Sequence, residues 1–248
     1  MNNIKKTINL IKKKKLTIGA WLQVSNADSA EIIGHANFDW VAIDFEHGTI
    51  KINELTNVIR ALELGQKLTF VRIANKNPNV IGNIMDSGAR GLIVPNIESR
   101  EEIESIIEKT FYPPIGKRGV GFSRANRFGE KINDYKNKQK DLIVIAMIES
   151  QKGYENLEDI LRAKNLSGVF IGPYDLSASM NLLGKFEHKK FKDTINKIIK
   201  VCKKYKKLCG IHVVENNIDL LKRRIKEGYK FIAYSTDTVI LNSYKINL

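Results

Sequence analysis

The stretch Asp44-Phe45-Glu46-His47-Gly48-Thr49 places three titratable side chains within four positions, directly after a largely apolar run at residues 38–43. Burying such groups is costly unless they pair or bind something. Two carboxylates and an imidazole at a strand end therefore indicate a chemical site. His47 is a candidate general base, because neighbouring carboxylates favour that role over a histidine that caps a helix or lies in the core.

Polar side chains also end three other apolar runs of the chain, namely Arg72, Glu149 and the stretch Gly172 to Asp175. Arg72 alone could be an ordinary ion-pair partner of a strand-end carboxylate. Glu149 and Asp175 would be desolvated if they stayed unpaired. Two carboxylates with no cysteine or second histidine beside them suit Mg²⁺ or Mn²⁺ better than structural zinc. The sequence therefore predicts a divalent-metal site at Glu149 and Asp175.

The elements that must position these residues recur along the chain. Short apolar runs are mostly followed by helical patterns of about ten residues or more, which is typical of parallel βα units. The eight expected strands are 16–22, 40–45, 68–73, 91–95, 142–148, 168–171, 210–214 and 230–234, and helices are expected at 27–36, 52–64, 78–86, 100–109 and 218–227.

Eight such units predict an α/β fold of the (β/α)8, or TIM, barrel class, with residues 1–248 as a single domain. In such a barrel the residues that close each strand converge on one face, so the polar groups described above would meet there. A doubly wound sheet is the alternative. It usually carries G-x-G-x-x-G after its first strand, which Gly19-Ala20-Trp21 does not match.

The composition favours a soluble, cytoplasmic protein. Hydrophobic residues make up 43% of the chain, with 5 prolines, so a sizeable core is expected. No apolar stretch approaches the roughly 20 residues of a membrane span, and the first residues lack the apolar core of a signal peptide. Cys202 and Cys209 are too sparse for a disulfide framework and are expected to be reduced.

The formal net charge of +14 raises the possibility of nucleic-acid binding. The densest lysine series, between residues 197 and 207, alternates with apolar residues at helical spacing. That pattern is typical of an amphipathic helix with a solvated outer face. We therefore expect neither a nucleic-acid nor a membrane partner.

An ordered set of motifs resembles the HpcH/HpaI family of metal-dependent pyruvate aldolases, from about Gly19 to Asp237. The motifs are Gly19-x-Trp21, Glu31-Ile32, Phe38-Asp39-Trp40-Val41-x-Ile43-Asp44-x-Glu46-His47-Gly48, Val71-Arg72, Asp86-x-Gly88-Ala89-x-Gly91, Tyr112-Pro113-Pro114-x-Gly116-x-Arg118-Gly119, Ile148-Glu149-Ser150 and Ile171-Gly172-Pro173-x-Asp175-Leu176-Ser177. The resemblance implies a (β/α)8 barrel that cleaves a 4-hydroxy-2-oxo acid to pyruvate and an aldehyde, or runs the reverse condensation. It also implies a homo-oligomer, hexameric in the family.

The resemblance further implies roles for individual residues. His47 would be the base, Asp86 would raise its basicity, and Asp44 could also orient it. Arg72 would stabilise the enolate oxygen. Glu149 and Asp175 would hold Mg²⁺ or Mn²⁺, with Co²⁺ as another candidate. The residues implied at the substrate are Trp21, Met147, Gly172, Pro173, Tyr174 and Asp175, and the loop 116–121 would lie near the active site.

The chain departs from the family pattern at several positions. Met147 stands where the family usually has a glutamine that contacts the pyruvyl group, and methionine cannot donate that hydrogen bond. Tyr174 replaces a small residue, and Asn181 replaces a common glycine. Only residues 238–248 follow the eighth expected strand, which is short for the final helix that family members exchange between subunits.

Two other functions stay open at this point. One is a citrate-lyase-like lyase acting on an acyl thioester on the same barrel, against which the Asp-x-Glu-His stretch argues. The other is a non-catalytic, basic binding protein on a decayed barrel, which the methionine at position 147 keeps possible. The aldehyde half of the substrate has no signature in the sequence.

Overall fold

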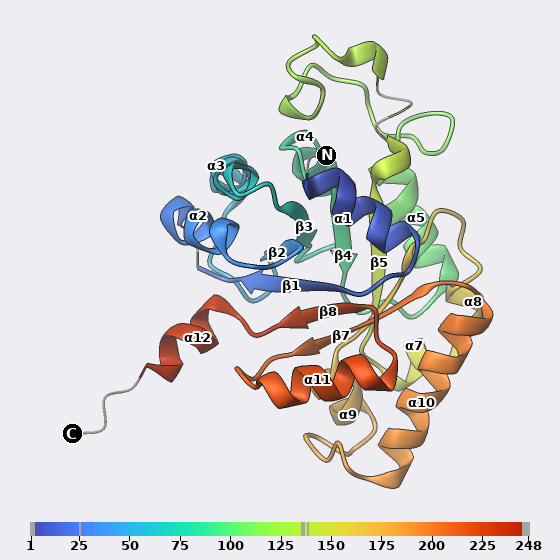
Figure 1. Ribbon diagram of the computed structural model, residues 1–248. Coiled ribbons are helices and arrows are strands. Elements are labelled where there is room, and N and C mark those ends of the chain that lie inside the picture. Colours follow the sequence, from blue (N-terminus) through green and yellow to red (C-terminus); the bar gives the residue numbers. More distant parts are fainter. Residues whose placement is uncertain (1–2, 25, 135–136, 138, 245–248) are drawn as a thin grey trace.

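The computed structural model describes residues 3–24, 26–134, 137 and 139–244. Eight parallel strands close into a barrel in chain order, and β1 pairs with β8 (Figure 1). The strands are β1 (Thr17–Leu22), β2 (Trp40–Asp44), β3 (Leu68–Arg72), β4 (Gly91–Val94), β5 (Ile143–Ile148), β6 (Gly168–Ile171), β7 (Leu208–Val213) and β8 (Phe231–Tyr234). The predicted (β/α)8 barrel is confirmed, and every expected strand is found within two residues of its expected ends.

Helices surround the barrel. The expected ones are α2 (Ala27–His35), α3 (Ile52–Leu64), α4 (Pro78–Asp86), α5 (Arg100–Thr110) and α11 (Ile218–Glu227). The others are α1 (Asn3–Lys12), α7 (Gln151–Glu155), α8 (Leu157–Ile160), α9 (Pro173–Ser179), α10 (Lys189–Lys204) and α12 (Asp237–Ser243). Helix starts follow local chemistry: Ser99 caps α5 by accepting a hydrogen bond from the Glu102 backbone N–H.

Aromatic side chains fill the interior of the barrel. Trp40 stacks on Phe231 with ring centroids 4.1 Å apart, and Phe70 packs edge-on against both. A Cβ at Gly19 would lie 2.1 Å from Trp40 Cδ2, so the indole fits only beside a glycine. The interior is therefore a packed core rather than a channel, as is usual for this fold.

The two ends of the barrel differ, because all strands run the same way. The carboxyl end holds the loops that follow the strands. The amino end is covered by α1, whose Ile8 and Ile11 join the core beside Leu68, Ile143 and Leu208.

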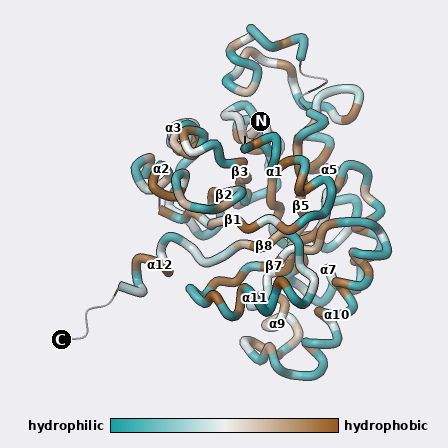
Figure 2. The backbone as a smooth tube through the Cα atoms, viewed as in Figure 1, coloured by the Kyte–Doolittle hydropathy of each residue, from teal (hydrophilic) through white to brown (hydrophobic). Residues whose placement is uncertain are grey.

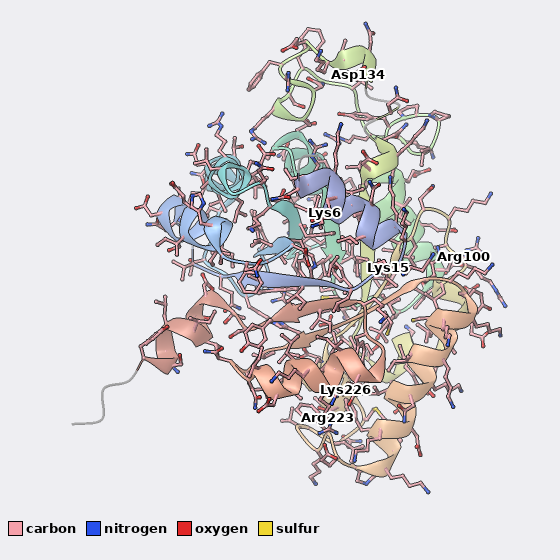
Figure 3. All side chains as sticks on the ribbon, viewed as in Figure 1. Lys6, Lys15, Arg100, Asp134, Arg223 and Lys226 are labelled. Carbon is pink, nitrogen blue, oxygen red and sulfur yellow. The ribbon has the colours of Figure 1, made fainter. Side chains whose placement is uncertain are left out.

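The described residues between α5 and β5, which are 111–134, 137 and 139–142, project from the amino end and are largely hydrophilic (Figures 1 and 2). They contain three short 3₁₀ turns, Arg124–Asn126, Ile132–Asp134 and Gln139–Asp141. Asp134, labelled in Figure 3, lies on this projection. The projection thus extends on the side of the barrel opposite the strand-end loops.

Helix α10 has the expected amphipathic character. It buries Phe191, Thr194, Ile198, Val201 and Cys202, while most of its lysines are exposed. Cys202 and Cys209 are buried free thiols, as expected. Within the described ranges, no helix has the length and apolarity required to cross a bilayer.

Candidate active site

Strand ends bring the predicted residues together at the carboxyl end. Asp44 pairs in register with Arg72 on the neighbouring strand, and the pairing of Ile148 with Ile171 sets Glu149 beside Gly172. A Cβ at position 172 would lie 2.6 Å from Glu149 Oε1, so the carboxylate rests against glycine backbone. Gly172 then leads through Pro173 into α9, which carries Asp175 in its first turn.

Arg72 is held by two carboxylates. Its Nε and Nη2 donate to the two oxygens of Asp44 at 2.8 and 2.6 Å, and Nη1 lies 2.9 Å from Glu46 Oε2. Burial alone would raise the pKa of Asp44, but the hydrogen bonds and charge of Arg72, together with the hydrogen bonds from Gln23 and the His47 backbone, outweigh it and lower that pKa. These contacts use three of the five N–H groups of the guanidinium. One N–H on each terminal nitrogen is left to meet a ligand.

Glu149 lies in a crowded acidic setting. Its Oε2 accepts a hydrogen bond from the Asn96 backbone N–H at 2.8 Å. Burial, together with the negative charges of Glu46 and Asp175, raises the pKa of Glu149 to about 7 despite that hydrogen bond. Burial also raises the pKa of Glu46, and Asp44 and Asp175 add to the shift. The negative charges of Glu149, Glu46 and Asp175 repel one another here, so a bound cation would stabilise them.

These carboxylates fit a hard divalent ion. In the described part of the chain, no three acidic, histidine or cysteine side chains form a complete metal cage. Mg²⁺ and Mn²⁺ do not need one, because they often take one or two carboxylates and complete their shell with water and substrate oxygens. Glu149 and Asp175 are the two carboxylates that could hold such an ion.

The structure exposes His47 beside the site. Asp44 Oδ1 accepts the backbone N–H groups of Glu46 and His47, at 3.1 and 3.3 Å. Asp44 therefore fixes the turn that carries His47, and the contacts of the described residues include none between the imidazole and a carboxylate. The expected orienting of the imidazole by Asp44 is indirect, through the backbone.

Within one chain, Asp86 does not lie beside His47. It ends α4 at the amino end, where the next residues lead into β4 and Arg90 N–H bonds Thr69 O. A five-residue strand spans roughly 15 Å, so the two residues are separated by about the length of the barrel. The Asp86 carboxylate instead pairs with Arg118, and the loop 116–121 lies at the same end.

The other predicted substrate residues divide into two groups. Trp21 and Met147 are buried in the barrel, 1% and 4% exposed, and form the floor beneath the site. Arg72 Cζ lies 5.2 Å from the Trp21 ring centroid, so the indole supports the guanidinium. Tyr174 lies at the rim, where its hydroxyl donates to Glu215 Oε1 at 3.0 Å.

Sequence reasoning missed several supporting residues. Gln23 Nε2 donates to Asp44 Oδ2 at 3.1 Å, and the Asp237 carboxylate accepts the backbone N–H groups of Gln23 and Val24 at 2.9 Å each. Gln23 follows β1 and Asp237 follows β8, so both could have been found by the same rule that located Arg72 and Glu149, namely that polar residues just after a strand converge at the carboxyl end of the barrel. Glu46, recognised only as part of a motif, proves to be a direct partner of Arg72.

His212 belongs to the barrel interior. Its ring lies 4.8 Å from that of Trp21, and Nε2 bonds Ser235 O at 3.0 Å. Burial, reinforced by the positive charge of Arg72, lowers the pKa of His212 to about 4. A neutral histidine therefore lies beside the arginine.

The fold and this site define a (β/α)8-barrel enzyme with an acidic, arginine-containing centre at the carboxyl end of its strands. Residues 17–243 match the family model of HpcH/HpaI aldolase/citrate lyase. A 5-keto-4-deoxy-D-glucarate aldolase of Escherichia coli O157:H7 is 33% identical over 232 residues, covering 93% of this chain and 90% of the relative. One of Citrobacter koseri is 32% identical, covering 93% and 89%.

A solved structure from Burkholderia cenocepacia J2315, of an HpcH/HpaI aldolase/citrate lyase family protein, superposes with a TM-score of 0.91. It is 26% identical, and the match covers 98% of this chain and 96% of that one. The chain belongs to the HpcH/HpaI aldolase/citrate lyase family. It is a carbon–carbon lyase of the aldolase type, and the resemblance seen in the sequence is confirmed.

Proposed function

We propose that the protein is a class II aldolase that cleaves a 4-hydroxy-2-oxo acid into pyruvate and an aldehyde, and catalyses the reverse condensation. The observation that carries the proposal is the half-buried Glu149, whose pKa is raised to about 7 among other carboxylates, beside an arginine that keeps N–H groups for a ligand. The names of the similar aldolases support the reaction type.

Glu149 and Asp175 would hold the divalent ion, Mg²⁺ or Mn²⁺, with Co²⁺ as another candidate. Such an ion, when bound, supplies Lewis-acid stabilisation of the enolate that cleavage generates. Arg72 adds preorganised N–H donors for the same negative oxygen, because Asp44 and Glu46 fix its orientation. Trp21 and Met147 close the floor against water, and Gly172, Pro173 and Tyr174 border the mouth.

His47 would take the proton of the substrate's 4-hydroxyl group during cleavage and return it during condensation. Its exposed position at the mouth leaves room for a substrate or for a water that relays the proton. The carboxylate that keeps this imidazole basic must come from elsewhere, because Asp86 lies at the other end of its own barrel.

We infer that a second copy of the chain supplies Asp86. The family pattern implies both Asp86 and the loop 116–121 at the active site, while each chain holds them together at its amino end through the Arg118 ion pair. The Asp86 side chain is 38% exposed, so it can reach a neighbour. The amino end of one copy would then face the carboxyl end of another, in a homo-oligomer for which the family suggests a hexamer.

The decisive test is metal-dependent pyruvate release. A 4-hydroxy-2-oxo acid is incubated with the purified protein, and pyruvate is detected by coupling to lactate dehydrogenase. We expect chelation to abolish release, Mg²⁺, Mn²⁺ or Co²⁺ to restore it, and Glu149→Gln to prevent restoration. Glu155→Gln, which alters an exposed carboxylate on α7, is the matched control. Full activity of the chelated enzyme would refute the proposal.

The same assay separates the alternatives. Release of acetyl-CoA or another thioester from an acyl-CoA substrate, without pyruvate, would instead identify a citrate-lyase-like enzyme. Lack of turnover together with salt-sensitive nucleic-acid binding would identify a basic binding protein. A cytoplasmic location and a single domain over residues 1–248 remain part of the proposal.

A further inference from the structure

A cavity of about 590 Å³ lies at the amino end, between the projecting segment and the start of β4. We call it the amino-end cavity. Its lining includes Ile4 of α1, Gly88 to Arg90 before β4, and Arg124 to Phe128 of the projection. The ionisable side chains that line it are Arg90, Arg118, Arg124, Arg127, Lys131, Glu63 and Asp134. Five are basic and two acidic, and once Asp86 and Glu130, which pair with three of these cations, are counted, an excess of one positive charge remains.

Most of these cations have identified partners. Arg118 pairs with Asp86 and lies 4.4 Å from the Tyr112 ring centroid. Arg124 pairs with Glu63 and donates to Ser87 O at 3.0 Å. Arg127 and Lys131 lie 3.6 and 3.4 Å from Glu130 at the exposed edge.

Arg90 is the exception. Among the described residues, no carboxylate pairs with its guanidinium, and its buried Nε has no hydrogen-bond acceptor. The Nε of Arg118 is also buried without an acceptor, and that side chain is 4% exposed. A buried donor without an acceptor costs free energy, and an uncompensated buried charge costs more. The charge of Arg118 is compensated by Asp86, so it is Arg90, a cation in the cavity wall without a carboxylate partner among the described residues, that indicates an anion in the cavity.

We propose that the amino-end cavity binds a phosphate group, either as inorganic phosphate or on a small phosphorylated metabolite. Guanidinium groups match phosphate because they offer two N–H donors in one plane. The volume exceeds that of a phosphate ion and lies in the usual range of small-molecule sites. Within one chain this site lies at the opposite end of the barrel from the candidate active site. In the proposed assembly its Arg118 side, which pairs with Asp86, faces a neighbouring copy, but phosphate binding does not depend on the proposed reaction.

The test is calorimetric titration of the full-length, metal-free protein with inorganic phosphate, at an ionic strength held constant with chloride. Arg90→Gln removes the unpaired charge, and we expect phosphate affinity to fall at least tenfold. Arg223→Gln is the matched control. Arg223 lies on α11, far from the projection that carries Asp134 in Figure 3, and pairs with Glu187 and Glu227. The Arg223→Gln variant should bind phosphate with the same affinity as the wild type.

Arg90→Lys keeps the charge but not the planar pair of donors, so an intermediate affinity is expected even if Arg90→Gln folds poorly. Glycerol phosphate is titrated in parallel. Tighter binding than inorganic phosphate assigns the cavity to a phosphorylated metabolite, and weaker binding assigns it to phosphate itself. The proposal is overturned if phosphate binds no better than chloride, or if binding is unchanged in both Arg90 variants, as it would be for phosphate held near Arg72.

Discussion

Glu149 should make the metal-free protein less stable as the pH rises. Its pKa is raised from 4.5 to about 7 in the folded state, so between these values the folded protein holds a proton that the unfolded chain has released. Stability is therefore fully present below about pH 4.5 and is lost as the pH rises through 7. At 1.36 kcal/mol per pKa unit, the loss is on the order of 3 kcal/mol.

Glu149→Gln isolates this effect, because glutamine resembles the protonated acid and can still accept the Asn96 N–H. Urea unfolding is measured in chelator at pH 5 and pH 8. Relative to the wild type, Glu149→Gln should gain on the order of 3 kcal/mol between the two pH values, and Glu155→Gln should not. Added Mn²⁺ should stabilise the wild type at pH 8 and leave Glu149→Gln unaffected. An equal difference between variant and wild type at both pH values would refute the argument.

Other predictions concern turnover. Arg72→Lys should fold, because it keeps a charge beside Asp44, yet lose roughly 10²-fold or more in kcat, since lysine cannot reproduce the fork of donors; circular dichroism and steady-state kinetics check this. His47→Ala should cost roughly 10²-fold or more and flatten the rise of activity with pH that a general base produces. The Asp86→Asn and His47→Ala proteins should each be impaired alone. When the two are unfolded together in equal amounts and refolded, the mixture should regain about one quarter of wild-type activity. In that mixture one site in four combines an intact His47 from one chain with an intact Asp86 from another.

Each of these has a contradicting result. Near-normal kcat in a folded Arg72→Lys would remove the arginine from oxyanion stabilisation. A pH profile of His47→Ala that matches the wild type would make the stretch 44–49 a structural strand ending. Mixed Asp86→Asn and His47→Ala proteins that stay as inactive as their parents would rule out a site shared between copies.

The barrel could be predicted because each strand is a continuous apolar run bounded by a change to helical spacing. Helix α1 was not predicted. Its apolar positions Ile4, Ile8 and Ile11 are interspersed with polar residues and lysines, and only the tertiary structure shows that Ile8 and Ile11 cover the barrel end. The hydrophobic pattern of the sequence therefore located the strands but not helix α1, which covers their amino end.

The strand-end rule brought Asp44, Arg72 and Glu149 to one face, but it could not say which groups pair. Whether Arg72 meets Asp44, Glu46 or a ligand depends on side-chain directions that spacing does not encode. The role of Asp86 came from family resemblance, which assigns a function without a location. Its place at the end of the helix before β4 already puts it at the amino end.

The packed side chains of Trp40, Phe70 and Phe231 close the barrel interior. Substrate and product cannot pass through the barrel, so they must enter and leave at its carboxyl end. In the proposed assembly another copy sits across that end. The interface between neighbouring copies would then control the entry of substrate and the exit of product. Substitutions that weaken this interface would change the rate of product release without altering any residue that touches the reacting atoms.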